Sequence, residues 1–261
     1  MKKLLIFVPV SLLVTISLPA FAAEKTCDLS GEYKSFALAV QNPSYSQEGI
    51  QKELSARASL LSVAIGCARE DVIDLKNQIL TDDNTSDSAN QIKERVVESL
   101  DEAIRFYDMK KDSIKDQGIQ GTKDLAREIK VWRDSNYDQL SGRVKNFMLW
   151  SSNQSLFEKA SDRLSQSQLV VTSLKVLENE DSEKVYYDAK LKLETAQKLN
   201  GEAGAAIARG ASSEETFGMI KNSLEALSNT YKNFFEISGK LNKTDGVDEL
   251  VPMTDSDSKD E

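Results

Sequence analysis

The sequence predicts an all-α protein, an elongated antiparallel helical bundle with coiled-coil-like seams. Three observations support this fold class. The span from Ser44 to Val251 contains no proline, and a proline inside a helix costs roughly 3 kcal/mol. Apolar residues recur along this span at alternating spacings of three and four positions, which places them on one helix face. The segments between these stripes are short and polar, and short connections favour antiparallel neighbouring helices.

Two helices are expected in the first half of the chain. The first follows the break at Pro43, where Ser44-x-x-Gln47 has the spacing of a capping box, and the polar run Asp82 to Asp87 ends it. Ser88-x-x-Gln91 repeats the capping pattern for the second. The predicted buried stripes are Leu54, Ala58, Leu61, Ile65, Ala68, Val72, Leu75 and Ile79 on the first helix, and Ile92, Val96, Leu100, Ala103, Tyr107 and Ile114 on the second.

The middle of the chain is predicted to be helical after an interruption at Gly118 to Gly121, with Thr122 as the cap. It forms either one helix or two. The polar run Ser151 to Ser155 is the candidate break, but it contains neither glycine nor proline. Residues 168–174 suit a strand by propensity alone, and the helical spacing of their neighbours favours helix. The predicted stripe is Leu125, Ile129, Trp132, Leu140, Val144, Phe147, Phe157, Ala160, Leu164, Val171 and Leu174.

Two further helices complete the predicted bundle. Asp181 or Ser182 begins the first, which the small-residue stretch Gly201 to Ala211 is expected to weaken. Ser212-x-x-Glu215 is a third capping box and begins the second. The predicted stripes are Tyr186, Ala189, Leu193, Ala196, Ala203 and Ile207, and then Phe217, Ile220, Leu224, Leu227, Tyr231, Phe234 and Leu241, with Ser238 as the one polar member.

The amino-terminal residues predict export. Met1-Lys2-Lys3 precedes an apolar run, and Ala20-Phe21-Ala22 forms a small-x-small cleavage site, as in bacterial-type signal peptides. The alternative is an uncleaved anchor, against which Pro9 and the cleavage site argue. We therefore expect a signal peptide at 1–22, one helical-bundle domain at 23–241 and a disordered acidic tail at 242–261, in a periplasmic or secreted protein.

The chain contains two cysteines, Cys27 and Cys67. In an oxidising compartment an even number of cysteines is most simply interpreted as disulfide-bonded. The bond would pin the amino-terminal segment to the first long helix, and the chain-entropy model gives it about 4 kcal/mol as an upper value. The alternative is two free thiols, with Cys67 a small apolar core residue.

Composition excludes several classes of function. The net charge of −9 becomes −11 once the two leader lysines are removed, which disfavours nucleic acid as a partner. The absence of histidine excludes Ser-His-Asp and Cys-His catalysis, histidine zinc sites and Glu-x-x-His di-iron sites. The mixed, net acidic helix faces disfavour membrane insertion after signal cleavage. No cofactor is expected, and paired-carboxylate hydrolysis remains a third hypothesis without positive support.

The loop Asp82-x-Asn84-x-Ser86 has the spacing of the first ligands of a calcium loop. Position six is Asp87 instead of glycine, and position twelve is Lys93 instead of glutamate. A helix-capping acidic turn explains the same residues, so no metal ligand is expected here.

One segment combines both tryptophans of the chain with polar donors at helical spacing. Aromatic planes beside amide and guanidinium groups are typical of a groove for a sugar, a peptide or a partner helix. The alternative is a packed helix crossing in which these groups satisfy one another's hydrogen bonds. The candidate binding residues are Trp132, Tyr137, Arg143, Phe147, Trp150, Gln154 and Phe157.

The favoured functional hypothesis is a non-enzymatic, extracytoplasmic helical bundle that acts as a scaffold, through an unidentified protein partner or self-association. A bundle that binds a small ligand or glycan at the same residues is the alternative.

Overall fold

The computed structural model describes residues 27–41, 46–84, 86–175 and 180–244, and within them the chain forms six α-helices, one short 3-10 helix and no strand. The predicted all-α helical bundle is confirmed. The regular side-chain packing of a coiled coil stays a prediction. The elements are α1 (Ser30–Gln41), α2 (Gln47–Leu80), α3 (Asp87–Ser113), η1 (Ile114–Asp116), α4 (Ile119–Lys175), α5 (Glu180–Arg209) and α6 (Ser213–Thr244).

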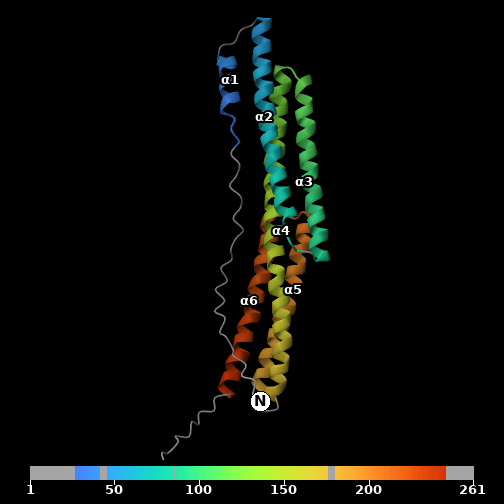
Figure 1. Ribbon diagram of the computed structural model, residues 1–261, viewed down its shortest axis with the longest axis vertical. Helices are drawn as coiled ribbons and strands as arrows, with labels where there is room; N and C mark the ends of the chain where they lie inside the picture. Colours follow the sequence, from blue (N-terminus) through green and yellow to red (C-terminus); the bar gives the residue numbers. More distant parts are fainter. Residues whose placement is uncertain (1–26, 42–45, 85, 176–179, 245–261) are drawn as a thin grey trace, which may run out of the picture.

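The molecule is a rod built around α4 (Figure 1). This helix has 57 residues, so it is roughly 85 Å long. Helices α2 and α3 pack along the upper half of α4, whereas α5 and α6 pack along its lower half (Figure 1). Helix α1 lies against α2 at the upper end. The rod therefore consists of two three-helix segments that share one continuous helix.

Serine caps begin α2 and α3, at positions other than those predicted. The Ser46 hydroxyl accepts a hydrogen bond from the Gly49 N–H, and the Ser86 hydroxyl accepts one from the Ala89 N–H. Both serines keep the extended backbone that a cap requires. The predicted cap at Ser88 is wrong, because it already lies in the first turn of α3. Ser44 lies outside the described residues.

Helix α4 resolves the choice between one helix and two in favour of one. The polar run at 151–155 does not break it, and several of its side chains bond back to carbonyls of the same helix. Asn153 Nδ2 donates to the Leu149 carbonyl and Gln154 Nε2 to the Trp150 carbonyl. The predicted cap Thr122 is also wrong. It lies inside the first turn, buried, and its hydroxyl donates to the Ile119 carbonyl.

Helix α5 ends in a Schellman motif, which forms the turn to α6. The small residues after position 200 do not end α5, which continues to Arg209. Gly210 then adopts φ 73°, the left-handed conformation that glycine tolerates best. The Ala211 N–H bonds to the Ala206 carbonyl and the Gly210 N–H to the Ile207 carbonyl, which is a Schellman ending.

Helix α6 begins where the capping pattern places it and continues slightly past the predicted domain boundary at 241. The Ser212 hydroxyl accepts from the Glu215 N–H, as the third capping box predicts. Helix α6 ends at Thr244. The predicted signal peptide and the remainder of the predicted tail, 245–261, lie outside the described residues.

Buried apolar residues form two clusters, one in each half of the rod. The buried stripe of α6 is rotated relative to the prediction: Phe217 is 50% exposed, while its neighbour Thr216 is buried. Two of the buried hydroxyls on this stripe bond within the helix, whereas the Thr216 hydroxyl has no partner among the described residues. Ser223 donates to the Ile220 carbonyl and Thr230 to the Ala226 carbonyl.

Candidate functional site

The most aromatic part of the predicted binding surface lies in the interior. Phe147, Trp150 and Phe157 are only 0%, 3% and 6% exposed. The Trp150 indole packs on Gly204 of α5, where an added Cβ would lie 3.0 Å from the ring, and its Nε1 donates to the Asn200 carbonyl at 3.0 Å. No partner can contact these side chains while the helices stay packed, so their interpretation as a binding surface is corrected.

Arg143 binds the end of α5. Its Nε donates to the Ile207 carbonyl at 2.7 Å and its Nη2 to the Ala208 carbonyl at 2.9 Å, while Nη1 donates to the Ser99 hydroxyl. Burial lowers the pKa of Arg143, and the positive charge of Arg95 lowers it further. The guanidinium nevertheless stays charged, because an arginine pKa starts so high. It offsets the negative end of the α5 dipole.

Two amides complete this contact. Asn146 Nδ2 donates to the Ser213 carbonyl at 2.8 Å, and Gln154 Oε1 accepts from Asn200 Nδ2 at 2.9 Å. These bonds join α4 to both sides of the α5–α6 turn. We call this region the junction; it consists of Arg143, Asn146, Trp150, Gln154, Asn200 and Gly204. It has the features of the packed crossing that the sequence left open.

Trp132 and Tyr137 lie nearer the surface, half-buried. Trp132 stacks on Phe106 of α3 with ring centroids 4.3 Å apart. Arg133 lies over the Tyr137 ring at 4.3 Å and donates to Asp71 of α2 at 2.9 Å. Beside Trp132 there is a shallow hollow of about 490 Å³, lined by α4 residues that include Asp124, Arg127, Glu128, Val131, Ser135 and Asn136.

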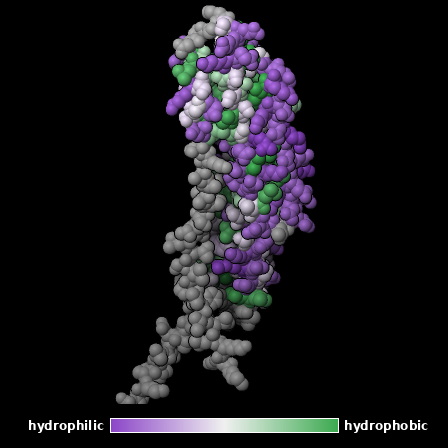
Figure 2. Space-filling model, turned by 45° about the horizontal axis from the view of Figure 1, so that its top comes forward, coloured by the Kyte–Doolittle hydropathy of each residue, from purple (hydrophilic) through white to green (hydrophobic). Residues whose placement is uncertain are grey.

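A larger apolar groove of about 700 Å³ lies at the upper end of the rod, between α1, α2 and the first turns of α4. Pale and green atoms gather there among purple ones (Figure 2). We call it the α1 groove. Its apolar lining is Leu29, Tyr33, Phe36, Leu60, Leu61, Ala64 and Ala126, and Ser30, Arg57, Thr122 and Lys123 complete it.

Two cations border the α1 groove. Arg57 bonds to Glu53 at 2.7 Å and lies over the Phe36 ring at 4.9 Å, so it links α1 to α2 and its charge is matched. Lys123 is exposed and forms no ion pair with the residues that the structure describes. The rim therefore combines apolar surface with a positive charge, that of Lys123, which no described residue pairs.

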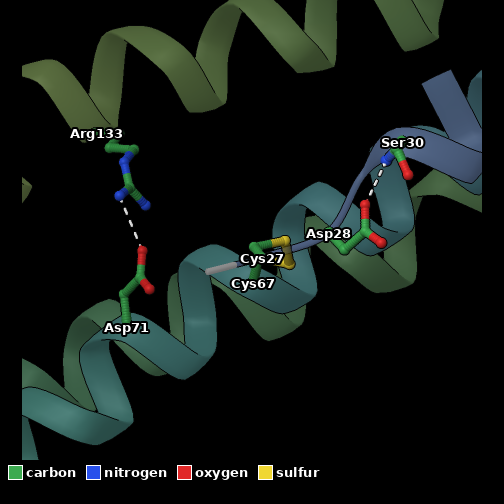
Figure 3. The surroundings of a disulfide bond; sticks show 6 residues. All are labelled: Cys27, Asp28, Ser30, Cys67, Asp71 and Arg133. Carbon is green, nitrogen blue, oxygen red and sulfur yellow. Dashed lines mark hydrogen bonds and ion pairs between the residues drawn. A yellow bond between two sulfur atoms is a disulfide. The ribbon is translucent and has the colours of Figure 1, made fainter. Parts of the chain in front are cut away.

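A disulfide positions the α1 wall of the groove (Figure 3). Cys27 and Cys67 lie at disulfide distance, with Cα atoms 5.8 Å apart, inside the usual range. Asp28 accepts a hydrogen bond from the Ser30 N–H at the start of α1, and hydrogen bonds from the Ser30 side chain and backbone lower the pKa of Asp28. Helix α1 itself contains no fully buried residue. A covalent bond and partial contacts, instead of a core of its own, hold this helix on α2.

The acidic loop after α2 is a connection between helices. Asp82 Oδ1 accepts from the Asn84 N–H and the Ser151 hydroxyl, and the Asp82 carbonyl accepts from Lys93 Nζ. Across the described ranges, no group of three or more acidic or cysteine side chains is placed to hold a metal ion. Within the same ranges, no helix has the length and apolar character needed to cross a membrane.

Sequence reasoning missed the α1 groove. Leu29, Tyr33 and Phe36 have helical spacing of four and three, and this pattern could have identified an apolar face on α1. Leu60 and Ala64 form a second row beside the main stripe of α2, as expected for a helix with a broad apolar face.

No family model, no curated protein and no solved structure matches this chain.

Proposed function

We propose that this protein is a non-enzymatic, extracytoplasmic helical bundle that binds a protein partner through the α1 groove. The observation that carries the proposal is the groove itself: an apolar surface bordered by helices and left open in a molecule whose other long stripes pack together. Grooves of this kind accept extended or helical apolar segments of other proteins.

The lining of the groove suits protein recognition. Tyr33 and Phe36 supply aromatic surface, which is enriched where proteins bind one another most tightly. Tyr33 is 62% exposed, so its ring is available to a partner. The unmatched charge of Lys123 favours a partner with acidic residues beside its apolar ones.

The rest of the molecule supports a scaffold role. Helix α4 is continuous from the groove to the other end of the rod, and the junction fixes the lower helices to the upper ones. A partner bound at the groove would therefore be held at one end of a spacer roughly 85 Å long. The predicted leader and the cysteine pair support a place outside the cytoplasm.

The non-enzymatic part of the proposal is supported by composition. Histidine is absent from the chain, which excludes Ser-His-Asp and Cys-His catalysis.

Site-specific photo-crosslinking in cells tests the proposal. A photoreactive phenylalanine analogue replaces Tyr33 in the groove or, as a matched control, Tyr187, which is 58% exposed in the lower half. We expect one protein to be captured from position 33 and not from position 187. The purified partner should then bind the Lys123→Glu variant about tenfold more weakly. Equal capture at both positions, or unchanged affinity for the variant, would contradict a groove site.

The hollow beside Trp132 favours a second candidate, the binding of a small polar ligand such as a glycan. It combines part of an indole face with carboxylate, hydroxyl and amide groups. This candidate predicts a saturable rise in melting temperature with a glycan, which Ser135→Trp would abolish by filling the hollow.

A further inference from the structure

We propose that the α1 groove of one molecule binds the Leu250–Met253 segment of a second copy, so that molecules associate head to tail. This inference rests on the proposed function, because it names the partner of the same groove. The composition of residues 245–261, the distance that they can span and the position of the groove support it.

The segment after α6 matches the groove chemically. Leu250-Val251-Pro252-Met253 is a short apolar run in a strongly acidic sequence, preceded by Asp248 and Glu249 and followed by Asp255 and Asp257. The groove offers the complement, an apolar lining with the unmatched Lys123 at its rim. An apolar segment with acidic flanks is the chemistry that this rim favours.

The segment cannot reach the groove of its own molecule. Helix α6 ends at the opposite end of the rod from α1 (Figure 1). Lys123 lies in the first turns of α4 and Lys175 is its last residue, so the rise of the helix separates them by roughly 80 Å. From Thr244 to Met253 a fully extended chain spans roughly 30 Å. Only the groove of a second molecule is therefore accessible.

The contact joins two different surfaces, so it is heterologous. Each molecule retains a free groove at one end and a free segment at the other, and a contact of this kind grows into chains unless its rotation closes a ring. A short segment that orders on binding also loses conformational entropy, so we expect weak, concentration-dependent association.

Two complementary variants test the inference. Residues 23–244 keep the groove and lack the segment. Leu60→Glu in residues 23–261 keeps the segment and places a negative charge in the apolar lining of the groove. Leu60 lies outside the core clusters, so the bundle should still fold. In sedimentation velocity each variant alone should be monomeric. Their equimolar mixture should form a 1:1 complex and stop there, whereas unaltered 23–261 should give progressively larger species.

Two further variants separate the groove from the rest of the surface. Leu169→Glu, at a 72% exposed position in the lower half, should associate like the unaltered chain. Lys123→Glu, on an exposed side chain, should weaken association about tenfold without changing the circular dichroism spectrum.

Association of 23–244 alone, or no complex in the mixture, would overturn the inference. If the mixture forms no complex but another protein is captured specifically at position 33, the proposed function still holds. If nothing is captured either, both the proposed function and this inference are wrong.

Discussion

Single side chains at the junction decide how the helices meet. Arg143 is the clearest case, because one guanidinium binds two final carbonyls of α5 and a hydroxyl of α3. The last carbonyls of a helix have no partner within the helix, and water can bond to them only at the surface. Buried helix ends therefore need a donor from the protein. The charge also lies where the helix dipole favours a cation. The sequence predicts Arg143 to be a binding residue, and the structure places its guanidinium on the end of α5.

Arg143→Met is therefore expected to lower the free energy of unfolding by about 2–4 kcal/mol, since it removes three hydrogen bonds and leaves the Ala208 carbonyl without this donor, while the Ile207 carbonyl keeps the Gly210 N–H. Arg127→Met is the matched control: Arg127 is exposed and, among the described residues, bonds only to Asp124 within its own helix, so the loss should stay below about 0.5 kcal/mol. Urea unfolding followed by circular dichroism measures both. Similar losses for the two variants would contradict the role assigned to Arg143.

Two glycines of α5 give a second test at this scale. At Gly204 an added Cβ would lie 3.0 Å from the Trp150 ring and 3.1 Å from Ile92 Cδ1, so the neighbours must shift. At Gly201 the space is open. Gly204→Ala should destabilise the protein by about 1 kcal/mol, the overpacking cost less the gain in helix propensity. Gly201→Ala should stabilise it by up to about 1 kcal/mol. Thermal unfolding would show opposite shifts in melting temperature.

At the scale of elements, helix α1 depends on the disulfide more than on packing. It has no fully buried residue, and its start is joined to α2 through Cys27 and Cys67. The groove loses a wall when α1 leaves α2. The start of the helix is thus secured, while the rest of it relies on contacts such as Arg57 over Phe36.

Cys27→Ser is expected to release α1 locally while the two core clusters stay folded, because those clusters contain no residue of α1. In hydrogen–deuterium exchange, amides of 30–41 should exchange much faster, and those of α3 and α5 should keep their protection. Cys67→Ser should behave identically, since each variant removes the same bond. Protection of α1 that survives both substitutions would show that packing alone holds it.

The elements also show how far sequence reasoning extends. Periodicity identified the buried face of α3 and that of α2 from Ile65 onward, whereas Leu54, Ala58 and Leu61 are only half-buried. The cap of α3 was misplaced because serines stand at both 86 and 88, and the choice depends on how the preceding loop docks on Ser151. The α1 groove lay beyond prediction, since it exists only where three separate helices meet at one end of the rod.

At the scale of the whole molecule, the junction couples the two halves. The upper core cluster includes Ala203 and Ile207 of α5 and Ile220 of α6, so the lower helices enter the upper core. Trp150 of α4 packs against Gly204 of α5 and donates a hydrogen bond to the Asn200 carbonyl. A continuous α4 and a shared cluster predict that the rod unfolds as one cooperative unit.

Trp150→Ala should break this coupling. Removing the indole leaves a cavity and removes its hydrogen bond to the Asn200 carbonyl, with an expected loss of about 3–5 kcal/mol. Calorimetry should then resolve two transitions in place of one, because each half keeps its own cluster. Trp132→Ala is the control: Trp132 is only half-buried and lies away from the junction, so its loss should be smaller and leave one transition. Trp150→Ala with unchanged stability would mean that the indole does not hold the halves together.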